Sequence, residues 1–309
     1  MARPPVDVVV PFRGSPAELD VVCERLAQLR LGAADSVVVV DNTPRPAAPA
    51  VSSESSIAIL RAADVATPGY ARNRGAERGS AQWLVFIDAD TIPAADLLDR
   101  YFDPAPEEGT ALLGGGILDE AVPARAGAIA RYSYIRGAMS QDNTFRFGHW
   151  GFPQTANAAC RRSAFEAVGG FRDHIRAAED ADLTYRLRAA GWGDERRECA
   201  AVVHCSRQTV RGFIAQNLGH GAGGAWLDRQ YPGSIPPRRR LGLAWWGVRT
   251  VLGNLPSAVW SRDRDRALRA LLDPVDELAY ELGRSLSNER PARHPLEAGG
   301  GQAGPSRGR

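Results

Sequence analysis

The stretch Leu84-Val85-Phe86-Ile87-Asp88-Ala89-Asp90 places two carboxylates directly after a short apolar run. Short runs that are rich in β-branched and aromatic side chains are typical of buried strands. We therefore predict a strand over 84–87, and we expect the chain to leave a sheet at Asp88.

Three similar apolar runs precede this strand, over 8–10, 37–40 and 57–60. Apolar residues recur at helical spacing from Leu19 to Leu29, and a second helix is expected over 70–78. Strands that alternate with helices pack best as a mostly parallel, Rossmann-like sheet flanked by helices. The predicted fold class is therefore α/β.

The regular alternation ends after Asp90. We expect later strands over 112–117 and 200–204, and helices over 124–139, 162–168 and 180–190. The predicted units are a main domain over 1–230 with halves of about 1–117 and 118–230, a helical segment over 231–288, and a tail over 289–309. Pro, Gly, Arg and Ser dominate the tail, which predicts disorder.

Composition excludes several classes of function. The chain has 309 residues, 44% of them apolar, and a formal net charge of +2. Its basic residues are spread along the chain, so nucleic acid is not expected as a partner. All 38 basic residues are Arg, which excludes any mechanism that needs a catalytic lysine.

The sequence shows no segment that would carry it into or across a membrane. The N-terminus runs directly into an apolar strand, without the pattern of a signal peptide. No apolar stretch approaches the roughly 18 residues that span a bilayer. We expect a cytoplasmic protein, either free or bound peripherally at the inner face of the membrane.

The pair Asp88 and Asp90 suits a divalent cation. Mg²⁺ and Mn²⁺ prefer carboxylate oxygens, and their sites commonly use one or two protein carboxylates together with substrate phosphates and water. The small Ala89 between them leaves room for a diphosphate. An isolated pair of this kind more often caps a turn or a helix, so the neighbouring residues must decide between a metal site and a cap.

Other polar residues follow the predicted strands. Pro11-Phe12-Arg13 follows the first strand and Asp41 the second, and such residues meet at the carboxyl edge of a parallel sheet, where ligands bind. Asn73 and Arg74 add an amide and a positive charge near a helix. Asp41 with its neighbour Asn42 is equally compatible with a turn.

A second acidic pair, Glu179 and Asp180, begins the helix predicted over 180–190. Leu183 and Leu187 lie one turn apart and should anchor this helix on the core, so that the two acids face a site. Acids in the first turn of a helix are also stabilised by the helix dipole, which is the alternative interpretation. The dipole should keep Asp180 ionised at neutral pH.

Taken in order, these motifs resemble those of family 2 glycosyltransferases over roughly Asp7 to Gly224. The matching motifs are Val-Val-Pro after the first strand, Val-Asp-Asn after the second, Ala71-Arg72-Asn73-Arg74-Gly75, Ile87-Asp88-Ala89-Asp90, Gly169-Gly170-Phe171 and Glu179-Asp180-Ala181-Asp182-Leu183. The resemblance implies a GT-A fold, with a nucleotide-sugar half over about 1–117 and an acceptor half over about 118–230.

The resemblance also implies roles for the candidate residues. Asp180 would be the catalytic base of an inverting transfer, with Glu179 beside it to orient the acceptor or to support the local hydrogen bonding. A metal would be held by Asp90, with Asp88 and His204 as further ligands, although a histidine that ends a strand is as often an ordinary core or surface residue. Those assigned to the nucleotide sugar are Pro11, Phe12, Arg13, Asp41, Asn73, Arg74 and Asp88.

The expected reaction moves a sugar from a nucleotide diphosphate sugar to an acceptor hydroxyl of a glycan, a lipid-linked molecule or a small molecule, with Mn²⁺ or Mg²⁺ as cofactor. Two alternatives stay open. One is a catalytically silent binding or scaffold protein of the same fold. The other is a sugar nucleotidyltransferase, which the absence of lysine and of a Gly-rich first loop disfavours.

The helical segment carries Arg238-Arg239-Arg240 ahead of several Leu, Val and Trp residues. Arginine is attracted to anionic lipid and tryptophan favours the membrane interface. Peripheral membrane contact through 238–288 is one expectation. The others are a helical cap on the catalytic domain and a homodimer contact through the same residues.

Overall fold

The computed structural model describes residues 3–44, 57–205, 209–237 and 240–290. Arg238, Arg239 and residues 291–309 of the predicted tail lie outside the described residues. The strands are β1 (Val6–Phe12), β2 (Ser36–Asp41), β3 (Ile57–Arg61), β4 (Trp83–Ile87), β5 (Thr91–Pro93), β6 (Thr110–Asp119), β7 (Asn157–Arg161) and β8 (Gly193–His204). They form one eight-stranded sheet in the order β3-β2-β1-β4-β7-β6-β8-β5.

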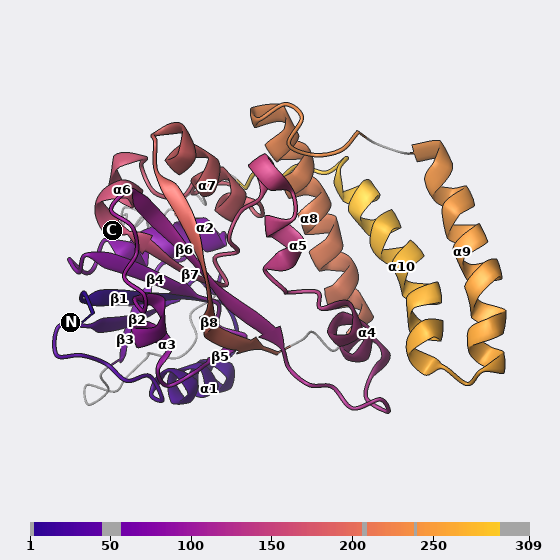
Figure 1. The fold of residues 1–309 in the computed structure, drawn as a ribbon, viewed down its shortest axis with the longest axis horizontal. Helices are drawn as coiled ribbons and strands as arrows, with labels where there is room; N and C mark the ends of the chain where they lie inside the picture. The colour runs from indigo at the N-terminus through magenta and orange to yellow at the C-terminus, as the bar shows by residue number, and fades with distance from the viewer. Residues whose placement is uncertain (1–2, 45–56, 206–208, 238–239, 291–309) are drawn as a thin grey trace, which may run out of the picture.

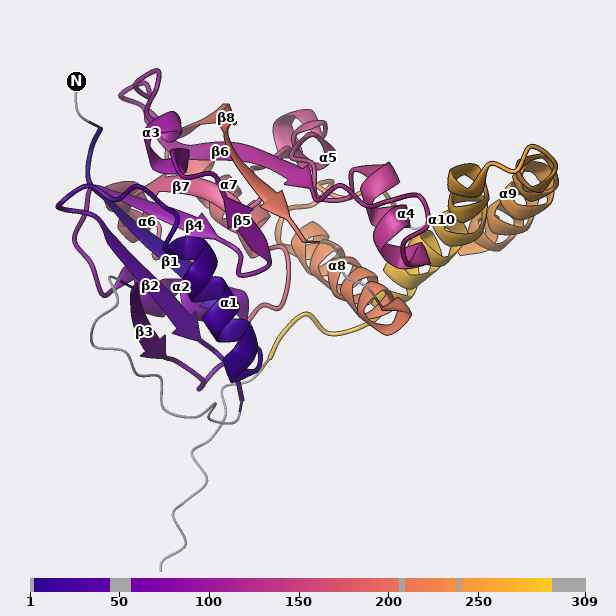
Figure 2. The same ribbon diagram turned by 90° about the horizontal axis from the view of Figure 1, so that it is seen from below.

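Helices cover both faces of this sheet, and the last three extend away from it (Figures 1 and 2). They are α1 (Pro16–Leu26), α2 (Pro68–Ala76), α3 (Leu97–Tyr101), α4 (Ala128–Arg136), α5 (Asp142–Phe145), α6 (Arg162–Ala167), α7 (Glu179–Ala189), α8 (Val210–Gln230), α9 (Arg240–Trp260) and α10 (Arg264–Gly283). The predicted α/β class and GT-A fold are confirmed. The boundaries drawn at 230 and 288 stay predictions.

The first half of the sheet is parallel, as predicted. β1 pairs in parallel with β2 and β4, and β2 with β3. Phe12 lies beside Asp41, and Asp41 beside Arg61, so the carboxyl ends of these strands are level. This register brings the residues that follow each strand to one edge of the sheet.

The second half of the sheet is mixed. β7 runs antiparallel to both β4 and β6, β6 and β8 are parallel, and β5 is an antiparallel edge strand on β8. Neither β5 nor β7 was predicted from the sequence, and β8 begins at Gly193 rather than at Ala200. Because β6 and β8 end together, Asp119 lies beside His204.

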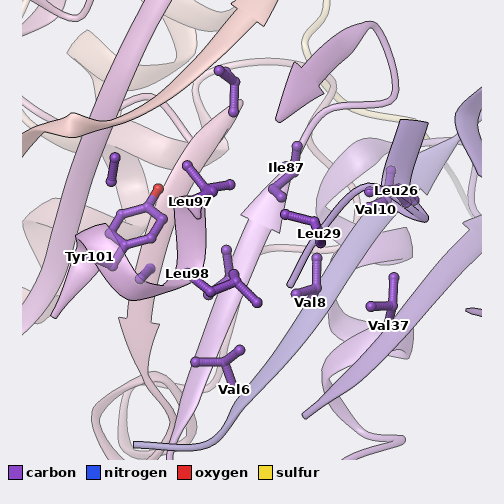
Figure 3. Packing of buried hydrophobic residues seen from close by; sticks show 14 of the residues in the cluster. Val6, Val8, Val10, Leu26, Leu29, Val37, Ile87, Leu97, Leu98 and Tyr101 are labelled. Carbon is purple, nitrogen blue, oxygen red and sulfur yellow. The ribbon is translucent and has the colours of Figure 1, made fainter. Parts of the chain in front are cut away.

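Alternate residues of the parallel strands enter two hydrophobic layers. Val6, Val8 and Val10 of β1 face α1 and α3, where they pack near Leu26 and Leu98 (Figure 3). Val9 enters the opposite layer, with α2 and α7. Burial on both faces explains why these strands are continuous runs of apolar residues.

The last three helices pack side by side, and two of them, α8 and α10, are in backbone contact. α10 packs between α8 and α9, and α9 is the outermost element (Figures 1 and 2). A Cβ on Gly221 of α8 would overlap the carbonyl oxygen of Tyr280, and one on Gly283 of α10 would overlap that of Leu218. Glycine at both positions lets the two helix backbones touch. Within the described residues, no helix has the length and apolar content needed to cross a membrane.

Candidate active site

A cleft of about 1870 Å³ opens at the carboxyl edge of the parallel strands. Its walls also include parts of α8, α9 and α10. The predicted site residues that line it are Pro11, Phe12, Arg13, Asp88, Asp90, Glu179 and Asp180. Residues separated by more than 160 positions in the sequence thus share one cavity.

A buried arginine that was not among the predicted site residues joins the two acidic pairs. Arg72 of α2 is only 3% exposed. Its guanidinium donates to Asp88 Oδ1 (2.6 Å) and to Glu179 Oε1 (2.8 Å). A buried charge is tolerated only when it is well paired, and here each end of the guanidinium meets a carboxylate. This contact holds the start of α7 against the end of β4.

Helical geometry selects Arg72 for this position. α2 is capped by Thr67, whose hydroxyl accepts a hydrogen bond from Tyr70 N, and the helix buries Ala71, Gly75 and Ala76. At about 100° per residue, Arg72 falls between Gly75 and Ala76 on the inward side. The motif was recognised in the sequence, but its helical periodicity was needed to show which arginine points inward.

Arg74 and Asn73 lie outside the cleft, although both were predicted to contact the nucleotide sugar. They line a second pocket of about 1140 Å³. Arg74 stacks over the ring of Tyr70 at 5.4 Å and pairs with Glu77. Asn73 donates to Phe171 O (2.8 Å) and accepts from Phe171 N (2.9 Å), so it ties α2 to the segment before α7.

Asp180 is the second residue of α7, and its carboxylate accepts a hydrogen bond from Ala181 N at 2.9 Å. Burial, followed by the negative charge of Glu179, raises the pKa of Asp180 to about 7. This shift goes against the expectation that Asp180 stays ionised at neutral pH, because burial and the charge of Glu179 outweigh the backbone hydrogen bond from Ala181 and the charge of Arg72. A carboxylate with a pKa near neutrality is well matched to accept a proton.

The remainder of α7 anchors this acid. Leu183 and Leu187 are buried in the core, as predicted. Asp182 is fully buried and accepts hydrogen bonds from Arg172 Nε (3.0 Å) and Tyr231 Oη (2.8 Å), as well as pairing with Arg186. These bonds fix α7 to its surroundings, so Asp182 has a structural environment unlike that of Asp180.

Asp90 and His204 face each other across the end of the sheet. His204 Nε2 lies 3.5 Å from Asp90 Oδ2, and His204 Nδ1 lies 3.7 Å from Asp119 Oδ1. Burial alone would lower the pKa of His204, but the nearby carboxylates of Asp119 and Asp90 raise it to about 9. In the described part of the chain, no three His, Cys, Asp or Glu residues form a metal-binding group by themselves.

These residues nevertheless fit a cation that is completed by substrate oxygens. Mg²⁺ usually takes only one or two protein ligands beside phosphate and water. His204 Nδ1 and Asp119 Oδ1 are buried with no hydrogen-bond partner among the described residues. A carboxylate facing the second ring nitrogen is the usual support of a metal-bound histidine. Asp88 is less available as a ligand because Arg72 occupies one of its oxygens.

Asp41 lies at the expected edge, but its carboxylate is already engaged. It pairs with Arg61 and accepts from Thr43 N (2.9 Å), and it does not line the cleft. Its neighbour Asn42 does line the cleft, and the Asn42 amide donates to Ala62 O and to Val65 O. This local network fixes the loop after β2 beside the cleft.

Comparison with known proteins agrees with this arrangement. Residues 7–169 match the family model described as glycosyl transferase family 2. A pre-mycofactocin glycosyltransferase of Mycobacterium tuberculosis is 27% identical over 82% of this chain and 55% of its own length. Glycosyltransferase AglE of Haloferax volcanii is 28% identical over 71% of each chain. The chain therefore spans about half the length of the mycobacterial relative.

A solved structure shares the fold at low sequence identity. The mannosyltransferase PcManGT of Pyrobaculum calidifontis, in complex with GDP-Man and Mn²⁺, has a TM-score of 0.53 and 15% identity. The similarity covers 92% of this chain and 74% of that one. The family match extends over more than half of the sequence and includes β1, α2 and the Asp88–Asp90 turn. The chain belongs to glycosyl transferase family 2.

Proposed function

We propose that this protein transfers a sugar from a nucleotide diphosphate sugar to an acceptor hydroxyl, with inversion at the anomeric carbon. One observation carries the proposal: Arg72 links Asp88 and Glu179, so the proposed donor end and the proposed base share one wall of the cleft. The GDP-Man and Mn²⁺ bound to PcManGT support the choice of donor and cation.

In this proposal Asp180 takes the proton of the acceptor hydroxyl as that oxygen attacks. Its raised pKa, near 7, favours proton transfer at neutral pH. Glu179 is held by Arg72, which suits it to fixing the base and the acceptor rather than to taking the proton. Attack from the side of α7, opposite the departing diphosphate, would invert the anomeric carbon.

The donor would lie against the sheet edge. Pro11, Phe12, Arg13 and Asn42 line that part of the cleft and would contact the nucleoside. Asp90 and His204 would hold Mn²⁺ or Mg²⁺, which would neutralise the charge of the diphosphate when bound. Asp41 would act indirectly, through its bonds to Arg61 and to the loop after β2.

The acceptor would enter beside the start of α7. Phe147, Trp150 and Phe152 line the cleft, and Trp150 and Phe152 pack in the same apolar cluster as Ala178 and Ala181. Aromatic faces suit the apolar faces of sugar rings or an apolar aglycone. The acceptor stays a proposal at the level of a glycan, a lipid-linked molecule or a small molecule, and the cytoplasmic location stays a prediction.

A thermal-shift screen of UDP-, GDP- and dTDP-sugars, with Mn²⁺ or with chelator, tests the donor half of this proposal. A ligand that binds only the folded state raises the melting temperature, by the equivalent of about 2.7 kcal/mol at a hundredfold excess over Kd. We expect the shift to need the metal, to be lost in Asp90→Asn and to be kept in Asp180→Asn.

Transfer or slow hydrolysis of a labelled sugar from the same donor tests the enzyme half. A silent binding protein would give the thermal shift without release or transfer of the label. A metal-independent shift, with equal turnover in excess chelator, would contradict the assignment of Asp90 and His204. No shift with any sugar nucleotide would contradict the donor class.

A further inference from the structure

The outermost helix, α9, exposes a stripe of large apolar side chains. Trp245 is 69% exposed, Leu252 70% and Trp260 92%, and Val248 and Val259 are also exposed. At about 100° per residue these positions fall within one face of the helix. A contiguous apolar face of this kind on a folded protein marks an interaction surface.

The opposite face of α9 is already used for packing. Ala258 is buried, and Leu243, Val251 and Leu255 are partly buried. Gly247 lies against Pro274 of α10. Since α9 packs on α10 through one face, the exposed stripe is a separate surface that points away from α10.

The charged residues in and around α9 indicate which kind of partner this stripe contacts. Between Arg238 and Arg262 the chain has five Arg and no Asp or Glu. Two of them, Arg249 and Arg262, lie within and just after the helix, and the other three, Arg238–Arg240, occur around its start. A second copy meeting face to face would bring these like charges together, whereas an anionic surface would neutralise them.

The aromatic residues sit at both ends of the stripe. Trp245 lies near the start of α9 and Trp260 at its last position. Tryptophan is enriched where a membrane meets water. Arg249 at the middle of the helix and the absence of a spanning helix among the described residues favour an orientation along the surface.

We propose that α9 lies on an anionic lipid surface, with Trp245, Leu252, Val259 and Trp260 inserted at the boundary of headgroups and acyl chains. The proposal commits to α9 rather than α10. α10 also exposes Leu278 and Leu282, but it carries four acids over 273–281, which an anionic surface would repel. The inference is independent of the proposed transferase activity, because lipid binding needs neither donor nor acceptor.

Flotation of the full chain with vesicles tests this surface. We expect binding to phosphatidylcholine vesicles that contain phosphatidylglycerol at low salt, and weaker binding at high salt or without the anionic lipid. Replacing Trp245, Leu252 and Trp260 together by Gln should weaken binding at least about tenfold. Arg249→Gln should weaken binding to anionic vesicles roughly fivefold.

A matched control is Val210→Gln, an equally apolar-to-polar change on α8 at a residue that is 57% exposed. It should bind vesicles as the parent chain does. The unfolding midpoint of each variant shows that the fold is kept. Failure of the parent chain to float with anionic vesicles, or full binding by the triple variant, would overturn the proposal.

A measurement of the oligomeric state tests the alternative that a second copy of the chain covers the stripe. Sedimentation equilibrium should show the same mass for the parent chain and the triple variant. If the parent were a dimer and the triple variant a monomer, the stripe would be covered by a second copy and the lipid proposal would be wrong.

Discussion

The carboxyl edge of the sheet buries charged side chains, whereas helix α9 exposes apolar ones. At the sheet edge, the charged side chains of Arg72 and Glu179 are buried, whereas α9 leaves Trp260 almost wholly exposed. The buried charges are compensated within the chain, since Arg72 pairs with both Asp88 and Glu179. The exposed apolar side chains have no such compensation within the described residues.

This difference indicates a catalytic role for the sheet edge and a binding role for α9. A buried, paired network holds groups in fixed positions, as chemistry on a small substrate requires. An uncompensated apolar surface is satisfied only by something outside the chain. The sheet edge should therefore respond strongly to changes of a single charged group, and the α9 stripe should hardly affect folding.

The largest effect is expected from Asp180→Asn. The amide keeps the size of the side chain but cannot take a proton, so transfer should fall by two to four orders of magnitude, or about 3 to 5 kcal/mol in the barrier. Donor affinity should stay nearly unchanged. Calorimetry and a transfer assay, run side by side on both proteins, measure this split.

Asp20→Asn, at an exposed position on α1, is the matched control and should leave turnover unchanged. Near-normal turnover in Asp180→Asn would remove Asp180 as the base and shift the role to Glu179. If donor affinity fell in parallel with turnover, Asp180 would be a donor-binding residue instead.

The next largest effect is on folding. Arg72→Gln leaves Asp88 and Glu179 without their shared cation in a buried setting, and breaking such a contact costs about 3 to 5 kcal/mol. Urea unfolding measures this loss. Arg74→Gln, on the same helix but at the solvent side, should cost less than about 1 kcal/mol. Equal losses for the two variants would show that the paired network does not hold α7 to β4.

A third effect follows the pKa of Asp180. Because the proton acceptor titrates near 7 beside Glu179, Arg72 and Tyr185, kcat/KM should rise about tenfold per pH unit below 7 and level off above it. The residual activity of Asp180→Asn should not show this rise of kcat/KM with pH below 7. If the same rise of kcat/KM with pH persisted in the variant, the titrating group would be a residue other than Asp180.

The same pKa predicts a change in stability. Folding raises the pKa of Asp180 above its usual 3.8, so the free energy of unfolding falls as pH rises from about 4 to 7. Asp180→Asn removes this penalty and should stabilise the protein at pH 8 by up to roughly 4 kcal/mol, with no gain near pH 3. Thermal melts at the two pH values check this, and a loss of stability at pH 8 would contradict it.

The smallest effect is expected on α9. Leu252→Gln changes an exposed side chain, so the free energy of unfolding should stay within about 0.5 kcal/mol of the parent value. Leu187→Gln, the same change in the core, should cost about 3 kcal/mol or more. A large loss for Leu252→Gln would mean that the stripe belongs to the fold and would weaken the contrast between the two regions.

Much of the fold could be predicted from local pattern. β1, β2, β3 and β4 were found because each is a short, nearly continuous apolar run, rich in β-branched or aromatic residues in β1, β2 and β4. α7 was found because Leu183 and Leu187 share a face. β7 was missed because Asn-Ala-Ala-Cys-Arg has no β-branched residue, and it is a strand only because β4 and β6 pair with it.

The sequence predicted which residues lie at the edge of the sheet, but not which side chains contact one another there. The sequence indicated that Asp88, Asp90 and Asp180 would approach one site, and all three line the cleft. It did not indicate that Arg72 rather than Arg74 turns inward, or that Asp119 would stand behind His204. The first depends on helix phase and the second on the pairing of β6 with β8, which joins residues that no local pattern connects.

The glycine contacts between α8 and α10 have a mechanical consequence. At Gly221 and Gly283 the two backbones touch without a side chain between them, so no rotamer change can absorb a displacement. α8 also lines the cleft, through Gly224 and Leu227. A displacement of α10 should therefore carry α8, and with it the part of the cleft wall that α8 forms.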